Sequence, residues 1–235
     1  MSLNKSDVLR PAEKAQQTHL LLQELYGELP LEPRREPMHE LLSTMLSHRT
    51  THANEEAAYY NMINTFGDWQ GVLAAPFEAL ADTLKPAKFP GAKAQNIQKA
   101  LTRIRERSPD FSLDFLRDLP EAEAMAWLHE LPGVGIKTAS LLLLFNYQKP
   151  VLPVDTHVHR VSQRVGILKA SDTAEKAHQI LTDMLPRDPR ILFNFHKHLY
   201  WHGQRICTWK SPRCEKCPLQ PLCNYYQEVR KKGLG

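Results

Sequence analysis

The sequence contains no apolar run that approaches the roughly 20 residues a helix needs to cross a membrane. The longest such run, Leu141–Phe145, is short enough to belong to a buried helix of an ordinary domain. The stretch Met1–Gln17 is polar and lacks the hydrophobic segment typical of a secretion signal. We therefore expect a cytoplasmic protein with no membrane association.

The alternation of apolar and polar residues that marks half-buried strands is also missing, as are internal repeats and low-complexity tracts. Apolar residues recur instead at helical spacing, and proline- and glycine-containing stretches separate them. The sequence therefore predicts an all-α fold. The predicted helices are Gln17–Tyr26, one beginning at Met38, His52–Phe66, Val72–Ala75, Pro76–Thr83, Ala92–Glu106, Phe115–Leu119, Glu121–Glu130, Ile136–Phe145, Thr156–Val165, Thr173–Leu185 and Pro189–Gly203, with an irregular segment from Arg205 onward.

Basic residues are unevenly distributed along the chain. Residues 151–235 contain 14 Lys and Arg against 7 Asp and Glu, whereas residues 1–150 contain 16 against 19. The corresponding net charges are +7 and −3, within a formal total of +4. This asymmetry favours a polyanionic partner on the C-terminal side, although a solvated basic face would give the same count.

A glycine-containing turn stands at Leu131–Ala139, with the sequence LPGVGIKTA, between two predicted helices. Gly133 and Gly135 permit a positive φ and leave no Cβ in front of the backbone N–H groups. Such a turn at a helix N-terminus can bind a phosphate oxygen through backbone donors and the helix dipole. Lys137 follows in the first helical turn, where the dipole disfavours an ammonium and favours a nucleophilic amine. The alternative is an ordinary helix–turn–helix corner with a surface lysine.

Only four cysteines occur, and all lie within one short C-terminal segment with the spacing C-x6-C-x2-C-x5-C: Cys207, Cys214, Cys217 and Cys223. Four cysteines so close together in a cytoplasmic protein indicate a metal site with thiolate ligands rather than disulfides. Zinc ribbons usually employ two separated C-x2-C pairs, and this segment has one. The spacing therefore favours a [4Fe–4S] cluster, with zinc as the alternative.

Three motifs together resemble the endonuclease III family of DNA glycosylases and abasic-site (AP) lyases, within the helix-hairpin-helix superfamily. They are the hairpin 131–139, the segment VDTH at 154–157, and the cysteine loop that follows His202 and Gly203. Asp155 stands eighteen residues after Lys137, which is the family's spacing. The resemblance extends from about Met38 to Cys223, nearly the whole chain.

The resemblance implies two α-helical lobes with a DNA-binding cleft between them. One lobe is a six-helix barrel that contains the hairpin, expected here at residues 38–149. The other joins residues 1–37 to residues 150–235 and carries the [4Fe–4S] cluster. The expected partner is double-stranded DNA with damaged bases or abasic sites, bound by a monomer that associates with the nucleoid if the cell is bacterial.

The resemblance also implies residue roles. Lys137 is expected to be the nucleophile and Asp155 the essential carboxylate, although an aspartate before a helix also suits an N-cap. Gly133, Val134 and Gly135 are expected to bind phosphate through backbone N–H groups. His157 matches the family, and it could either contact DNA or bond only to protein groups next to the site.

Three positions depart from the family pattern, and one of them is His159, where some members carry an apolar residue. Arg49 aligns with a glutamine that commonly fills the gap left by a flipped base, and Phe89 aligns with a second wedge position that is often leucine. Both are expected to contact DNA, and for Phe89 the alternative is a loop residue folded into the core.

The expected function is a bifunctional glycosylase and AP lyase that acts on oxidised pyrimidines. The alternatives are a weakly active or non-catalytic iron–sulfur DNA-binding relative and a glycosylase for alkylated or mismatched bases. The adenine-mismatch branch is disfavoured because it usually lacks the hairpin lysine and adds a C-terminal domain.

Overall fold

The structure is a computed structural model that describes residues 9–230 and residue 233. In this part of the chain all regular elements are helices and no strand occurs, which confirms the predicted all-α fold. None of the described helices combines the length and apolar character that a membrane span requires. The chain divides into two compact units: unit 1 comprises Met1–Leu31 with Gln148–Gly235, and unit 2 comprises Glu32–Tyr147.

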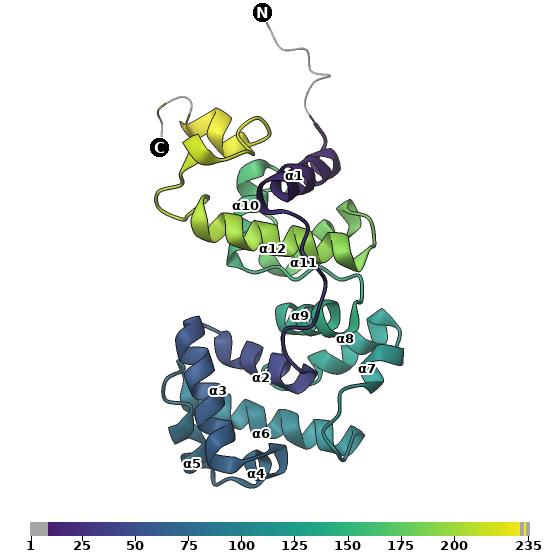
Figure 1. The fold of residues 1–235 in the computed structure, drawn as a ribbon, viewed down its shortest axis with the longest axis vertical. Helices are drawn as coiled ribbons and strands as arrows, with labels where there is room; N and C mark the ends of the chain where they lie inside the picture. Colours follow the sequence, from purple (N-terminus) through teal and green to yellow (C-terminus); the bar gives the residue numbers. More distant parts are fainter. Residues whose placement is uncertain (1–8, 231–232, 234–235) are drawn as a thin grey trace, which may run out of the picture. The chain divides into compact units, whose positions relative to one another are not determined.

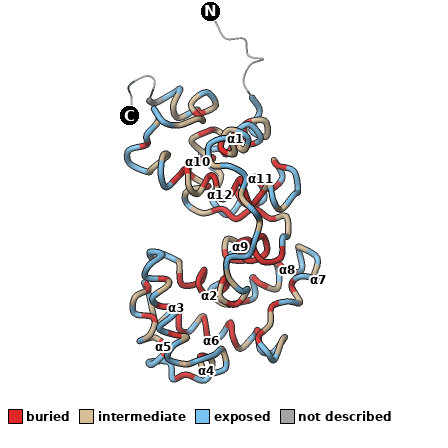
Figure 2. The backbone as a smooth tube through the Cα atoms, in the orientation of Figure 1, coloured by how far each residue is buried: buried red, intermediate tan, exposed pale blue. Residues whose placement is uncertain are grey.

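Unit 2 is built around α2 and the strongly buried α9 (Figures 1 and 2). α2 packs against α3, α6 and α9, while α4 and α5 cover α6, and α8 pairs with α9 across the hairpin. The helices are α2 (Pro37–Ser47), α3 (His52–Phe66), α4 (Trp69–Ala74), α5 (Phe77–Thr83), α6 (Pro90–Arg107), α7 (Phe115–Asp118), α8 (Glu121–His129) and α9 (Ile136–Tyr147).

Unit 1 is organised by α12, which packs against α10 and α1 (Figure 1). α11 contacts both α1 and α10, so the N-terminal helix is held by helices from the far end of the sequence. The elements are α1 (Pro11–Tyr26), α10 (Thr156–Val165), α11 (Ala174–Met184), α12 (Pro189–Arg205), the 3-10 helix η1 (Cys214–Lys216) and the π-helix η2 (Tyr226–Arg230).

Local signals explain where several helices begin and end. The Thr51 side chain accepts from the Asn54 amide to cap α3, and Gly67 ends that helix. Both α3 and α10 have the predicted bounds. α1 begins six residues before the predicted start, at Pro11, with Glu13 bonded back to Arg10. The segment from Arg205 onward is less irregular than predicted, because it contains η1 and η2.

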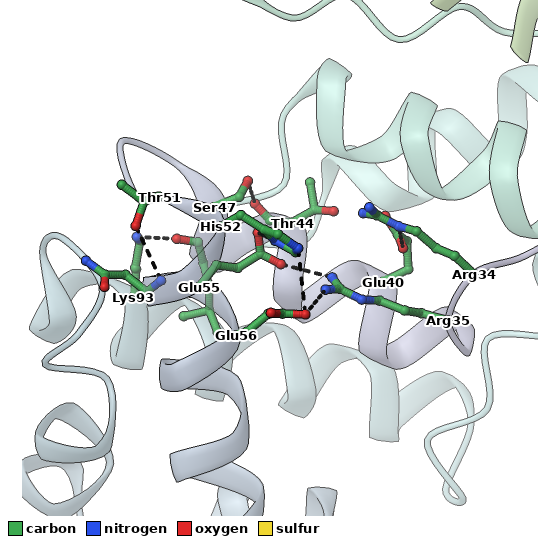
Figure 3. Close-up of polar contacts among 12 residues, drawn as sticks. Arg34, Arg35, Glu40, Thr44, Ser47, Thr51, His52, Glu55, Glu56 and Lys93 are labelled. Carbon is green, nitrogen blue, oxygen red and sulfur yellow. Dashed lines mark hydrogen bonds and ion pairs between the residues drawn. The ribbon is translucent and has the colours of Figure 1, made fainter. Parts of the chain in front are cut away.

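A buried ionic network ties the start of unit 2 to α3 (Figure 3). Arg35 Nη1 lies 2.9 Å from Glu55 Oε1, and both side chains are nearly buried. Arg35 also reaches Glu56 at 3.4 Å, and its carbonyl accepts from the Asn146 amide on α9. A buried ion pair needs this kind of additional bonding, because the desolvation of both charges is costly. The network fixes the direction in which the chain enters α2.

Candidate functional site

The glycine turn between α8 and α9 is held by tight packing on one side. Gly133 adopts φ +84°, and a Cβ there would stand 2.9 Å from Asn96 Nδ2 on α6. Val134 is buried, and its amide donates to the Leu131 carbonyl at 3.0 Å. The Val134 amide therefore already has a partner inside the chain, so the phosphate-binding prediction narrows to the two glycine amides.

Gly135 differs from Gly133 both in its packing and in its backbone conformation. Its φ is not positive, and a Cβ placed on it would meet no atom within 4 Å. Of the two glycines, only Gly133 uses the positive φ that the residue type permits. Neither packing nor backbone conformation requires a glycine at this position, and the exposed amide edge of the turn is left uncovered.

Lys137 occupies the first turn of α9, two residues after the glycine turn. From Thr138 to Tyr147 every residue of this helix is buried, and Figure 2 shows this continuous buried stretch. Lys137 itself is half-buried, and its ammonium forms no ion pair or hydrogen bond within the described part of the chain. The amine is consequently mounted on a rigid, buried helix while remaining accessible.

Asp155 is the N-cap of α10. Its Oδ1 accepts two hydrogen bonds at 2.8 Å, from the amides of His157 and Val158. The other oxygen, Oδ2, accepts no hydrogen bond from the described residues. The capping role is therefore present, and it leaves one carboxylate oxygen available for chemistry. Two amide donors also hold the carboxylate at a fixed angle.

His157 lies on the first turn of α10 and is tied to Arg160. The Arg160 guanidinium donates to His157 Nδ1 at 3.1 Å, so the neutral imidazole carries its proton on Nε2. Gly203 on α12 approaches closely, since a Cβ there would meet His157 Cβ at 2.7 Å. The ring of Tyr200 contacts the imidazole edge-on. His157 is thus positioned by three neighbours of its own unit.

Arg49 and Phe89 lie on two loops of unit 2 and share an unusual backbone conformation. Arg49 has φ +54° and Phe89 has φ +57°, both in the left-handed region that residues other than glycine rarely adopt. Both side chains are exposed, and Phe89 retains 53% of its accessible surface. The alternative that Phe89 folds into the core is therefore wrong.

The four cysteines line one hollow, together with residues such as Ile206 and Tyr225. None forms a disulfide. In the described part of the chain, no three His, Cys, Asp or Glu side chains form a group that could hold a metal ion. A [4Fe–4S] cluster is instead held by four thiolates around a larger inorganic core. Four cysteines that form no disulfide and line one hollow fit this group chemically.

Two arginines of α10 hold the cysteine loop. Arg160 donates to the carbonyls of Cys207 and Gly203, and burial lowers the pKa of its guanidinium. Arg164 donates to Cys207 Sγ at 3.3 Å and to the carbonyls of Thr208 and Trp209. Asp155 and the cysteine loop are therefore connected through one helix.

Sequence reasoning did not identify Arg160, Arg164 or Lys93 as important residues. The two arginines are four residues apart on the helix that Asp155 caps, which was a visible signal. Lys93 lies on the apolar face of α6 with Ile97 and Ile104, and a lysine there is an anomaly.

Comparison with known proteins shows which family the chain resembles. Residues 42–187 match the HhH-GPD superfamily of base excision DNA repair proteins. Endonuclease III of Thermotoga maritima is 34% identical over 200 residues, covering 85% of this chain and 87% of the relative. Endonuclease III of Bacillus subtilis is 33% identical over 84% of the chain and 85% of the relative.

A solved structure of a trapped endonuclease III–DNA covalent intermediate has a similar fold. The TM-score is 0.79, with 24% identity, and the match covers 94% of this chain and 99% of that one. Residues 42–187, which match the family model, include the hairpin with Lys137 and the capped helix with Asp155. The chain belongs to the endonuclease III family of the HhH-GPD superfamily of base excision DNA repair proteins.

Proposed function

We propose that this chain is a DNA glycosylase and AP lyase of base excision repair that removes oxidised pyrimidines from duplex DNA. The observation that carries the proposal is the accessible amine of Lys137, mounted on buried α9 directly after a turn with uncovered backbone donors. The family membership supports the reaction class. We further infer that unit 2 serves as the barrel domain with the hairpin, and unit 1 as the cluster domain.

In the proposed reaction, the Gly133 and Gly135 amides bind a backbone phosphate near the lesion. The damaged nucleotide leaves the stack, because its C1′ is inaccessible inside the duplex. The neutral amine of Lys137 attacks C1′, and the bond from C1′ to the base breaks so that the base departs with its electron pair. The added nitrogen gives up one proton, the C1′–O4′ bond of the sugar ring breaks as O4′ takes up a proton, and an iminium between Lys137 and C1′ remains.

Strand cleavage follows from this iminium. Removal of a proton from C2′ expels the 3′ phosphate by cleavage of the C3′–O bond, which is a β-elimination. Addition of water to the imine releases the sugar fragment and regenerates the amine. We propose that the Asp155 carboxylate stabilises positive charge on the sugar and assists proton transfer, using the oxygen that does not cap α10.

Cys207, Cys214, Cys217 and Cys223 would hold a [4Fe–4S] cluster through their thiolates. The group would act as a structural support that shapes a basic loop, where Lys210 and Lys216 can face phosphates. The purified protein should then be brown, with broad absorbance near the visible and about four irons per chain by metal analysis. A colourless protein containing zinc would overturn this assignment.

The decisive test is covalent trapping. Duplexes that each carry one lesion are incubated with the protein and borohydride, and the adduct is resolved by electrophoresis. Wild type should give an adduct with an oxidised pyrimidine, and Lys137→Gln should give none. Lys85→Gln, which alters an exposed lysine of the same unit, is the matched control. An adduct that persists in Lys137→Gln would exclude Lys137 as the nucleophile.

The same set of single-lesion duplexes also tests the two alternative functions, which the arginine at position 49 makes worth testing. An arginine has donors but no acceptors, so it should contact the opposite base differently from glutamine. Cleavage of only alkylated or mismatched duplexes would indicate a different specificity. Tight, salt-sensitive binding of abasic-site DNA without any cleavage would indicate a non-catalytic relative.

A further inference from the structure

Lys93 is a buried lysine whose ammonium is fully occupied by the last turn of α2 and the loop that follows it. Its Nζ donates to the Leu46 carbonyl at 2.5 Å, the His48 carbonyl at 3.1 Å and Thr50 Oγ1 at 2.9 Å. An ammonium has three donors, so no capacity remains for a phosphate. The side chain is only 7% exposed. Figure 3 shows Lys93 next to the segment that carries Ser47 and Thr51.

The acceptors flank Arg49 on both sides. Leu46 belongs to the last turn of α2, where carbonyls lack helical partners and a cation is favourable. His48 and Thr50 directly precede and follow Arg49. The Thr50 hydroxyl also donates to the His48 carbonyl at 3.1 Å. Hydrogen bonds to the residues immediately before and after Arg49 thus stabilise its left-handed backbone conformation.

The same lysine also contacts the second exposed position. Its backbone N–H donates to the Phe89 carbonyl at 3.1 Å, in the first turn of α6. The Lys88 amide donates to Thr50 Oγ1 at 3.2 Å, which joins the two loops directly. Lys93 and Thr50 therefore link both left-handed residues, although these are forty residues apart in the sequence.

A left-handed non-glycine residue is strained and persists only where its surroundings determine it. Here the ammonium of Lys93 holds the loop of Arg49, its backbone N–H bonds to the Phe89 carbonyl, and Thr50 joins the two loops. We infer that Lys93 is a positioning residue that presents Arg49 and Phe89 as a single preformed wedge for an opened base stack. This inference rests on the proposed function. A preformed wedge would favour DNA binding, because the two loops are already ordered and binding need not supply the free energy of ordering them.

The wedge should matter only where a stack must be opened. We therefore compare cleavage of an abasic site in a duplex with cleavage of the same site in a single strand, under single-turnover conditions. Lys93→Met should lower the duplex rate on the order of 10- to 100-fold, because loops that carry substrate-positioning groups are misplaced. The single-strand rate should be unchanged. Lys99→Met, an exposed lysine on the same helix, should leave both rates unchanged.

A second variant tests the same contact without replacing Lys93, in case Lys93→Met does not fold. Thr50→Val removes the shared hydroxyl while preserving shape and leaving Lys93 intact, and it should lower the duplex rate in the same direction. Thermal melting checks that each variant is folded. The inference is overturned if the folded variants lower both rates equally, or neither. A wild type that cleaves neither substrate would instead refute the proposed function. In that case the variants' preference for abasic over intact duplex in binding decides whether the wedge exists.

Discussion

Asn96 lies so close to Gly133 that a Cβ atom on the glycine would stand 2.9 Å from Asn96 Nδ2 and 3.0 Å from Asn96 Cβ. The helix that begins after Phe89 is therefore packed directly against the turn that precedes Lys137. Gly135, two residues further on, faces open space. Packing and backbone conformation thus require a glycine at position 133, and neither requires one at position 135.

This contrast predicts opposite effects of alanine at the two positions. Gly133→Ala should lower the free energy of unfolding by about 1–3 kcal/mol, because of its φ of +84° and the contact with Asn96. Gly135→Ala should leave stability nearly unchanged and weaken binding of abasic-site duplex, since its Cβ would cover the amide edge. Denaturant unfolding and fluorescence anisotropy measure the two quantities. Equal affinities of Gly135→Ala and wild type would refute phosphate binding at Gly135.

Much of the fold could be predicted because helix boundaries carry local chemical signals. His52–Phe66 was correct at both ends, with a threonine cap before it and a glycine after it. The start of α1 was missed although Pro11 and Glu13 are valid N-terminal signals, because its first turns lack large apolar residues. Periodicity alone gives no indication of a polar helix start.

The candidate site could be predicted only in part. Residues within a motif, such as Lys137 and Asp155, were identified from spacing and family resemblance. The bond from Lys93 to Leu46 spans 47 residues, and no local pattern specifies such a pair. The Val134 amide was assigned to phosphate, but its bond to Leu131 depends on the exact turn geometry.

Asp155 allows capping and catalysis to be separated by substitution. Asparagine is a good N-cap, so Asp155→Asn should retain stability while lowering the rate of base release, because the negative charge is lost. Asp155→Ala should lose activity and also about 0.5–2 kcal/mol of stability. Single-turnover base release and thermal melting provide the measurements.

The matched control is Thr173→Ala, which removes the cap of α11 in the same unit. It should cost a similar amount of stability, about 0.5–2 kcal/mol, and leave the rate of base release intact. If Asp155→Asn releases bases as fast as wild type, Asp155 is a structural cap only.

Arg164 should protect the cysteine loop. Its guanidinium bonds to Cys207 Sγ and to two loop carbonyls, and it stacks on the Tyr225 ring at 4.7 Å. Arg164→Met should therefore accelerate loss of the proposed cluster on exposure to air or chelator, followed by the decay of visible absorbance. Lys176→Met, an exposed residue on neighbouring α11, serves as the control. An unchanged decay rate in Arg164→Met would show that the loop is held by other contacts.

His198 makes stability dependent on pH. This side chain is fully buried on α12 beside Tyr26, and burial lowers its pKa from the usual 6.5 to about 4. Between these values the unfolded chain binds a proton that the folded chain excludes, so the folded state loses stability as the pH falls from 6.5 toward 4. His198→Asn should be less stable at neutral pH, yet its stability should decline less steeply over that window, by at most about 1.4 kcal/mol per pH unit. The matched control is His129→Asn, at an exposed position of α8, whose stability should fall with pH as steeply as that of wild type.

Carboxylates titrate in the same range in all three proteins. The difference between the slopes of stability against pH for wild type and for His198→Asn therefore isolates the buried imidazole. Identical slopes for His198→Asn and wild type would mean that His198 takes up its proton without unfolding the chain.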